Sequence, residues 1–334
     1  MTTIHASVDR SLRAVIVSRR SLFYAGGADP IADRPRHVRA ASSLAWIGDR
    51  ITLVQDDANF LAVIDPYGGD ARAITLPRGE GGHRQFDDAR GNKKYKFDFE
   101  ACASIAGADG PLLLAFGSGS KRRRRHIATI DGWDATAPRV RVVDATTLYE
   151  RLEAEATFAG SDMNIEGALV VGDALRFFGR GNGRARAGLM PVNATCDVSL
   201  VALLAYLQAP NDHDPPEPVN VAQYELGTLG GTLLGFTDAT TIGEGAIVYA
   251  ATAESSADAA EDGPVVGSVL GVIPPFGLAR YTVLTDETGH PSADKVEGVL
   301  RSRTSPHRVY IVIDADDHSR PSELCEVELF GSWG

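Results

Sequence analysis

The fold is decided by the stretch MNIEGALVVGDALRFFGRGN, residues 163–182. An acidic residue, Glu166, opens a short apolar run, and a Gly-Asp turn at residues 172 and 173 leads to a second apolar run and a polar loop. Short apolar runs that end at glycine- and aspartate-containing turns are typical of antiparallel β-strands. The stretch therefore predicts two neighbouring strands with an acid at the entrance of the first.

The same order of acid, apolar run, turn and polar loop recurs along the chain. The equivalent positions are Ser43, Glu100, Glu166, Asp238 and Glu297. They lie roughly sixty residues apart, a period typical of propeller blades that carry long loops. We therefore expect an all-β fold, a five-bladed β-propeller.

The repeat divides the chain into five expected blades and a single domain, residues 1–334. The blades cover approximately residues 42–80, 97–145, 163–225, 236–285 and 295–334. The last blade runs out of chain before a fourth strand, and the strand-like segment 12–17 precedes all of them. We expect this N-terminal strand to pair into the last blade and close the ring, since closure removes free sheet edges.

Two segments depart from the strand pattern. Residues 146–156 are rich in Leu, Glu, Arg and Ala and predict a short helix. Residues 198–208 are apolar and fit either a strand or a helical insertion.

Composition narrows the class of protein. The 334 residues carry a formal net charge of −11, which argues against nucleic acid as a partner. The roughly 18 uninterrupted apolar residues of a membrane helix are absent, and residues 1–20 lack a secretory hydrophobic region. We expect a cytoplasmic protein that has no membrane partner. Cys102, Cys196 and Cys325 lie far apart in apolar contexts, which predicts buried thiols.

The repeated acids are expected to meet. The innermost strand of each propeller blade lines the central channel, so acids at the entrances of these strands converge. They are Glu100, Glu166, Asp238 and Glu297. Confined carboxylates raise one another's pKa, and a hard cation relieves their repulsion. The pattern predicts a channel metal, Ca²⁺ first and Mg²⁺ as the other choice. The alternative is that the acids cap strand ends or pair with arginines.

Loop residues of the same face suit an anion. The run GSGSKRRRR, residues 117–125, combines hydroxyl and backbone donors with guanidinium groups, which bind phosphate or carboxylate in bidentate fashion. If the strand pattern continues from His126, alternate arginines point in opposite directions. The expected ligand-binding residues are Ser118, Ser120, Arg123, Arg124, Arg180 and Asn182. The alternative is a solvated basic turn.

The sequence does not identify a catalytic base. Glu254 and Asp57 are carboxylates expected on the ligand face, and either could activate water near a metal. His83 and His126 have no identifiable partner and are expected to be ordinary histidines. The sequence contains no GxSxG motif of a serine hydrolase.

Six motifs along the chain resemble those of a known protein family. The motifs that carry this resemblance are DFEA (98–101), GSGS with the following arginines (117–125), NIEGA (164–168), RGN (180–182), GFTDA (235–239) and VEGV (296–299). Together they resemble an uncharacterised family of bacterial β-propeller proteins over about residues 42–317, and the resemblance implies a propeller without a known activity. More distantly, the entry to the inner strands is similar to that of esterase-like-phytase and SdiA-regulated propellers. The blade count and channel acids are similar to those of calcium-activated nucleotidases, which implies Ca²⁺ in the channel below an anionic substrate.

These features predict a Ca²⁺-dependent hydrolase that acts on an anionic small molecule, a phosphoester or phosphoanhydride. A lactonase or esterase is a second enzymatic interpretation, although it leaves the basic run 121–125 without a role. The alternative class is a non-catalytic propeller that binds a ligand or partner and holds a structural cation.

Overall fold

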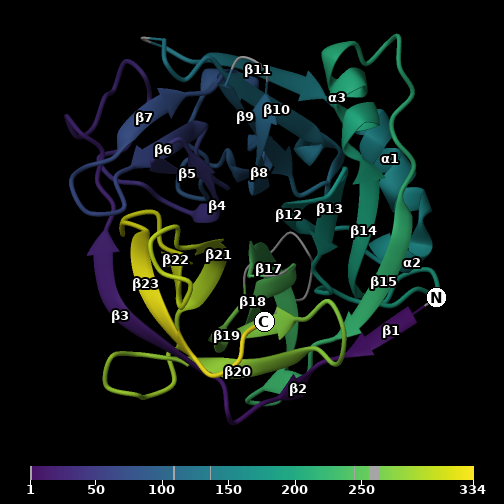
Figure 1. The fold of residues 1–334 in the computed structure, drawn as a ribbon. Coiled ribbons are helices and arrows are strands. Elements are labelled where there is room, and N and C mark those ends of the chain that lie inside the picture. The colour runs from purple at the N-terminus through teal and green to yellow at the C-terminus, as the bar shows by residue number, and fades with distance from the viewer. Residues whose placement is uncertain (1, 108–109, 136, 244, 256–262) are drawn as a thin grey trace.

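Short apolar runs separated by turns fold into mainly antiparallel sheets that stand around a common centre (Figure 1). The structure, a computed structural model, describes residues 2–107, 110–135, 137–243, 245–255 and 263–334. Within these residues the fold is all-β apart from short helices, which confirms the expected fold class at this level.

Two four-stranded sheets come first in the chain. Each is a simple antiparallel meander that begins nearest the centre. The strands of the first sheet are β4 (Ala41–Ile47), β5 (Arg50–Gln55), β6 (Phe60–Ile64) and β7 (Arg72–Thr75). Those of the second are β8 (Phe99–Gly107), β9 (Gly110–Gly117), β10 (His126–Asp131) and β11 (Arg139–Asp144).

The third sheet acquires a strand from the N-terminus. Its meander consists of β12 (Ile165–Val171), β13 (Ala174–Gly179), β14 (Asn193–Ser199) and β15 (Val219–Glu225). The N-terminal strand β1 (Thr2–His5) pairs in parallel with β15 at the outer edge. The sequence did not predict this strand, which carries no apolar periodicity of its own.

The remaining sheet joins two meanders. The first meander has β17 (Thr232–Ile242), β18 (Ala246–Glu254), β19 (Val265–Ile273) and β20 (Arg280–Thr285), with β16 (Thr228–Leu229) beside β17. The second has β21 (Lys295–Arg301), β22 (Arg308–Asp314) and β23 (Glu323–Phe330). Strand β3 (Arg13–Ser21) pairs antiparallel with β23 and parallel with β20, and β2 (Ser7–Val8) pairs with β20.

The inner strands β4, β8, β12, β17 and β21 surround the centre, and each contacts the next, with β21 contacting β4. The hydrophobic core lies between neighbouring sheets. One buried cluster joins β4–β7 to β8–β11, and another joins β21–β23 to β4–β7. Because sheets are covered on both faces, strands such as β6, with the sequence FLAVI, are apolar throughout.

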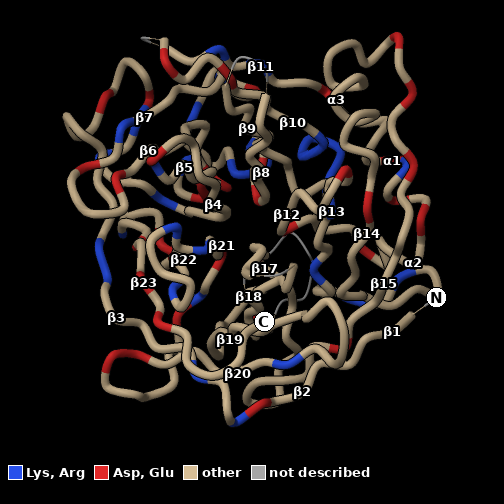
Figure 2. Tube along the Cα trace, viewed as in Figure 1, with Lys and Arg blue, Asp and Glu red and all other residues tan. Residues whose placement is uncertain are grey.

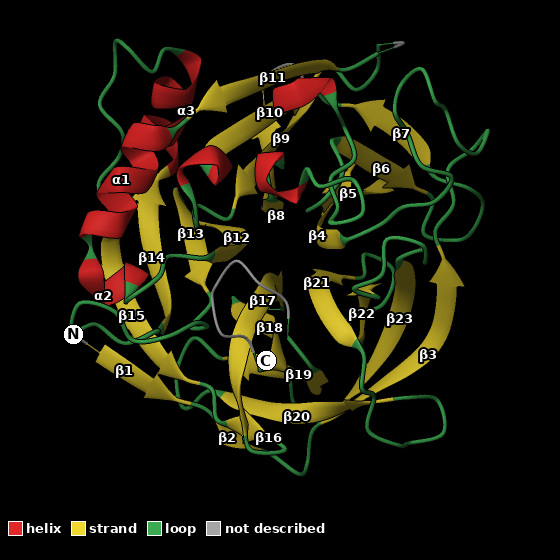
Figure 3. Ribbon diagram, turned by 180° about the vertical axis from the view of Figure 1, so that it is seen from behind, coloured by secondary structure: helices red, strands yellow, loops and turns green. Residues whose placement is uncertain are grey.

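Helices α1 (Thr146–Ala154), α2 (Ala156–Ala159) and α3 (Leu200–Gln208) lie at the periphery, beside β13–β15 (Figure 3). The Asp144 carboxylate accepts a hydrogen bond from the first backbone N–H of α1, which confirms the helix predicted there. The apolar segment 198–208 is the end of β14 followed by α3, because the Ser199 hydroxyl accepts from the Ala202 N–H and caps a helix. Apolar side chains three and four residues apart then bury one face of α3.

The cysteines are buried free thiols, as the sequence predicted. In the part of the chain that the structure describes, no helix combines the length and the apolar composition needed to span a bilayer.

Candidate functional site

A β-bulge at the start of three inner strands places a glutamate near the centre that the five inner strands surround, here called the channel. The pairing of β8, β12 and β21 with their neighbours shifts by one residue at Glu100, Glu166 and Glu297 respectively. A bulge leaves one residue out of the ladder and redirects its side chain. All three side chains consequently border one pocket.

The residue after each bulged glutamate is small because the inner strands approach closely. Ala101, Gly167 and Gly298 occupy this position. A Cβ atom on Gly298 would lie 2.4 Å from the backbone oxygen of Ser42 in β4, well inside van der Waals contact. The repeated acid-glycine motif is thus a packing requirement of the channel as well as a source of carboxylates.

The fourth predicted metal ligand, Asp238, lies elsewhere. The bulge of β17 falls between Phe236 and Asp238, so Thr237 is the equivalent of the glutamates and Asp238 is one residue further along. A one-residue step in a strand turns the side chain to the other side. The Asp238 carboxylate accepts hydrogen bonds from the Ser43 hydroxyl at 3.1 Å and the Val299 N–H at 3.0 Å. Asp238 therefore ties β17 to β4 and β21 inside the channel.

The entrance pocket is small and rich in charge. Its cavity volume is about 40 Å³. Its acidic side chains are Asp56, Asp98, Glu100, Glu166, Glu254, Glu297 and Asp314. Its basic side chains are Lys96, Arg124, Arg180 and Lys295. With all groups ionised, the seven acids and four bases leave a net charge of −3, and Figure 2 shows acidic and basic residues gathered around the centre.

One ion-pair group is centred on Lys96. Its ammonium lies 2.6 Å from Asp98 and also contacts Asp56, and Arg124 lies 3.0 Å from Asp98. Although burial opposes its charge, Lys96 and Arg124 hold the pKa of Asp98 well below its usual range. Asp98 has a φ of 62°, a left-handed conformation that aspartate tolerates better than most residues. The loop preceding β8 thus carries both a base and an acid into the pocket.

A second group is centred on Arg180 and Lys295. Arg180 lies 2.6 Å from Glu254 and 3.4 Å from Glu166. Lys295 lies 3.1 Å from Glu297. Burial raises the pKa of Glu166 to about 8 in spite of its arginine partner. Glu166 consequently holds a proton for much of the time at neutral pH.

Carboxylate oxygens are left over after this pairing. Among the described residues, Glu100 has no hydrogen-bond or ion-pair partner, and burial raises its pKa well above the usual value. The Oε2 atom of Glu297 is buried and likewise makes no hydrogen bond within the described ranges. Such groups carry a desolvation cost that a cation would offset.

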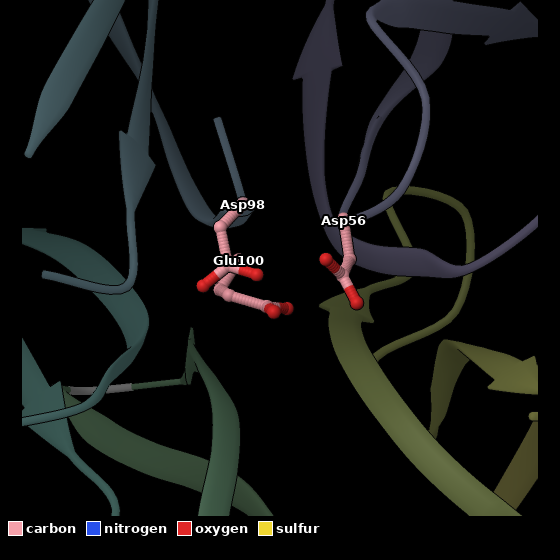
Figure 4. Close-up of side chains that lie close together, drawn as sticks. All are labelled: Asp56, Asp98 and Glu100. Carbon is pink, nitrogen blue, oxygen red and sulfur yellow. The ribbon is translucent and has the colours of Figure 1, made fainter. Parts of the chain in front are cut away.

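Three of the carboxylates are close enough to share a metal ion. One oxygen from each of Asp56, Asp98 and Glu100 lies within 4.8 Å of the others (Figure 4). Asp56 follows β5, whereas Asp98 and Glu100 flank the start of β8. Oxygen donors of this kind suit Ca²⁺ or Mg²⁺ rather than zinc. These three carboxylates therefore fit a hard cation. The ammonium of Lys96, which contacts Asp56 and Asp98, would compete with the cation for the same oxygens.

The predicted anion-binding residues do not form one site. Arg124, Arg180 and Asn182 border the pocket, but both arginines are bound to carboxylates. Ser118 donates to Asp98, and Ser120 bonds to Ser118 and Arg124. This serine pair therefore supports the acid rather than facing the cavity.

Arg123 lies outside the pocket. It pairs with Glu80 at 3.2 Å and lies over the ring of Tyr95. The expected strand alternation is wrong here, because Arg122–Arg124 form a 3₁₀ turn and β10 begins only at His126. The turn sends Arg124 inward and Arg123 to the surface.

Neither candidate base has an oxygen poised in the pocket. One Glu254 oxygen is bound by Arg180 and the other accepts the Gly263 N–H at 2.7 Å. Asp57 pairs with Arg39 and borders a neighbouring cavity. The sequence reasoning also missed Lys96 and Lys295, which precede the bulged acids by four and two residues. Strand alternation gave no signal for them, because Lys96 lies in the loop before β8 and a bulge follows Lys295 in β21.

Solved structures with an overall likeness are distant. Aldose sugar dehydrogenase from Streptomyces coelicolor, in its PQQ-bound form, is 10% identical, with coverage of 97% of this chain and 100% of that chain and a TM-score of 0.41. Virginiamycin B lyase from Staphylococcus aureus is 8% identical, with coverage of 95% and 99% and a TM-score of 0.37. Drosophila semaphorin 1b is 9% identical, with coverage of 97% and 88% and a TM-score of 0.39.

Likenesses this remote carry no functional argument, and comparison with curated proteins found no similar sequence. A family model, in contrast, matches residues 37–329, which include all the sheets described above except the strands of the N-terminal segment. The chain belongs to this family, a family of unknown function designated DUF6929.

Proposed function

We propose that the channel entrance binds a divalent cation, Ca²⁺ first and Mg²⁺ as the other choice, and that the protein uses it to hydrolyse an anionic small molecule. The observation that carries the proposal is the convergence of Asp56, Asp98 and Glu100, since one oxygen of each lies within 4.8 Å of the others. A divalent cation would offset the repulsion between these carboxylates and hold them in their ionised form.

The ion would be held by Asp56, Asp98 and Glu100, with Glu297 as a further carboxylate of the same pocket. When bound, such an ion polarises a phosphoryl oxygen and lowers the pKa of water. Because Arg124 and Arg180 are already paired with acids, the substrate anion is expected to lie above the pocket, at the ion. A phosphoester or phosphoanhydride is the expected substrate class.

Glu166 is the side chain best suited to move a proton. Its pKa of about 8 allows it to carry a proton at neutral pH and to donate it to a leaving oxygen. Asn164 donates a hydrogen bond of 2.6 Å to its Oε1 atom, which orients the carboxyl group. Glu166 replaces Glu254 and Asp57 as the proposed acid–base residue.

The architecture that supports this site is, we propose, a five-bladed propeller closed by β3. Five buried clusters each join two neighbouring groups of strands, in sequence around the centre. The pairing of β3 with β23 supplies the outer strand that the last meander lacks. The residues that would hold the ion, Asp56, Asp98 and Glu100, would then come from two neighbouring blades.

A second candidate function is a binding propeller without chemistry. The observation in its favour is that Lys96, Arg180 and Lys295 already neutralise several pocket acids. The protein could then hold a structural cation, or the bases alone could balance the charge. A lactonase or esterase remains the other enzymatic interpretation. The activity test below includes a lactone as a substrate in order to check it.

The test is calorimetric titration of EDTA-treated protein with Ca²⁺ and Mg²⁺, followed by turnover of p-nitrophenyl phosphate and of a simple lactone. Glu100→Gln is expected to weaken binding at least about tenfold, since it removes a charged ligand. Glu150→Gln, an exposed acid of α1, is the matched control. Ca²⁺-dependent phosphate release that falls at least about 100-fold in Glu166→Gln would support the proposal.

Other outcomes assign the alternatives. Saturable Ca²⁺ binding without turnover would identify a cation-dependent binding protein. Turnover of the lactone alone would move the assignment to a lactonase. Absence of binding by either ion would refute the cation site and leave an internal ion-pair network.

A further inference from the structure

The channel has a second cavity at its other end. Its volume is about 680 Å³. It is bordered by the later residues of the inner strands, whereas the entrance pocket is bordered by their first residues. The hydrogen bonds of Asp238 with Ser43 and Val299 lie between the two sets of residues. The volume falls within the range of roughly 300–1,000 Å³ typical of small-molecule sites.

Most of the side chains that line this cavity are apolar, and Ser104, Thr240 and Thr241 add hydroxyl groups. Side chains from several inner strands border it, and some of them, Trp46, Leu169 and Val170, are only partly buried. Apolar side chains that a folded protein leaves accessible inside a concave site are typical of ligand pockets. The ligand that fits must therefore bring an apolar body.

The rim of the cavity is basic. Arg301 and Arg303 border it, and no carboxylate among the described residues does so. Within the same part of the chain neither arginine has a carboxylate partner. Arg303 lies over the ring of Trp46, 4.7 Å from its centre, and donates to the Gly48 carbonyl. In a protein with a net charge of −11, a rim with two guanidinium groups and, among the described residues, no carboxylate favours an anion.

We propose that this second cavity binds an amphipathic anion, with an apolar chain in the cavity and a carboxylate at Arg301 and Arg303. The guanidinium fork suits a carboxylate, and the mainly apolar side chains of the wall, which include no carboxylate among the described residues, suit an apolar chain better than a cationic body. The site is independent of the cation pocket. Its failure would leave the proposed function untouched.

The test uses octanoate as the probe, measured by calorimetry and by tryptophan fluorescence, to which Trp46 in the cavity wall contributes. Octanoate is expected to bind at one site per chain, whereas octanol and acetate, which lack the charge or the chain, bind at least about tenfold more weakly. Arg301→Gln together with Arg303→Gln should weaken octanoate binding at least about tenfold. Val170→Trp should abolish it by filling the cavity.

The matched control is Arg13→Gln, since Arg13 also lies over an aromatic ring, that of Phe330, but at another surface. It should leave octanoate binding unchanged. Octyl phosphate, titrated in parallel, shows whether the head group is a carboxylate: tighter binding of the phosphate would overturn that assignment. The proposal as a whole is overturned if octanoate fails to bind, or if the double arginine variant binds it as the unaltered protein does.

Discussion

Replacement of Lys96 by methionine tests the charge balance of the entrance pocket most directly. Lys96 is buried, with 5% of its side chain exposed, and its ammonium contacts Asp56 and lies 2.6 Å from Asp98. Although burial alone would lower it, these acids raise the pKa of Lys96, so the group is charged at all ordinary pH values. Methionine keeps much of the volume and removes the charge.

The expected loss of stability is large. Removal of one partner from a buried ion pair costs about 3–5 kcal/mol, because the other charge stays buried without compensation. For 334 residues the entropy of unfolding is about 0.7 kcal/mol per kelvin, so the melting temperature should fall by about 4–7 °C in EDTA at pH 8. Lys94→Met is the control. Lys94 belongs to the same loop but is exposed, and it lies over Tyr95, so its loss should change little.

Calcium should then compensate for the missing ammonium. At a Ca²⁺ concentration 100 times the dissociation constant, the gain is about 2.7 kcal/mol, or about 4 °C on the same scale. The gain should be larger in Lys96→Met than in the unaltered protein, since Lys96 competes with the ion for Asp56 and Asp98. Differential scanning calorimetry with and without Ca²⁺ measures both effects. If the variant is destabilised but responds to Ca²⁺ no more than the unaltered protein does, the argument for a shared cation site is refuted.

Three further outcomes are expected. Arg180→Met should lower the free energy of unfolding by about 3–5 kcal/mol, whereas Arg123→Met, at the surface, should change it by less than about 0.5 kcal/mol in urea titrations. Because burial raises the pKa of Glu166 to about 8, the folded state binds more protons than the unfolded chain. The contribution of Glu166 to the stability of metal-free protein should accordingly be fully present below about pH 4 and be lost as pH rises to about 8. A contribution that increases between about pH 4 and pH 8 would contradict the raised pKa of Glu166. Gly298→Ala should cost at least about 1 kcal/mol, since the added Cβ meets a backbone oxygen at 2.4 Å, and an unchanged melting temperature would show that the strands separate easily.

The strands and the repeated acids could be predicted from the local sequence pattern. Apolar runs and turns are short-range features, and three of the four acids chosen from the repeat, Glu100, Glu166 and Glu297, do meet in one pocket. The helix at Thr146–Ala154 was likewise predictable from composition. The helix Leu200–Gln208 was not, because an apolar run of that length suits either structure until a neighbour covers it.

Asp238 and the arginine run mark the limit of pattern reasoning. Thr237 and Asp238 are adjacent in a polar-acidic pair, and only the hydrogen-bond register of β17 with β18 decides which of them is bulged. The sequence pattern predicts that the basic run 121–125 leads directly into a strand. In the structure a 3₁₀ turn precedes the strand and places Arg124 at the pocket and Arg123 at the surface.

By itself, the sequence determined that this protein is built from short repeated strands, each introduced by a polar or acidic residue, because apolar periodicity and turn residues act over a few neighbouring positions. Only the tertiary structure decided which acids face the channel, which bases neutralise them, and that mainly apolar side chains and two arginines line a cavity at its opposite end. Those outcomes depend on a one-residue bulge in each inner strand and on contacts between residues such as Arg180 and Glu254, which are far apart in the chain. Such contacts have no signature in local composition.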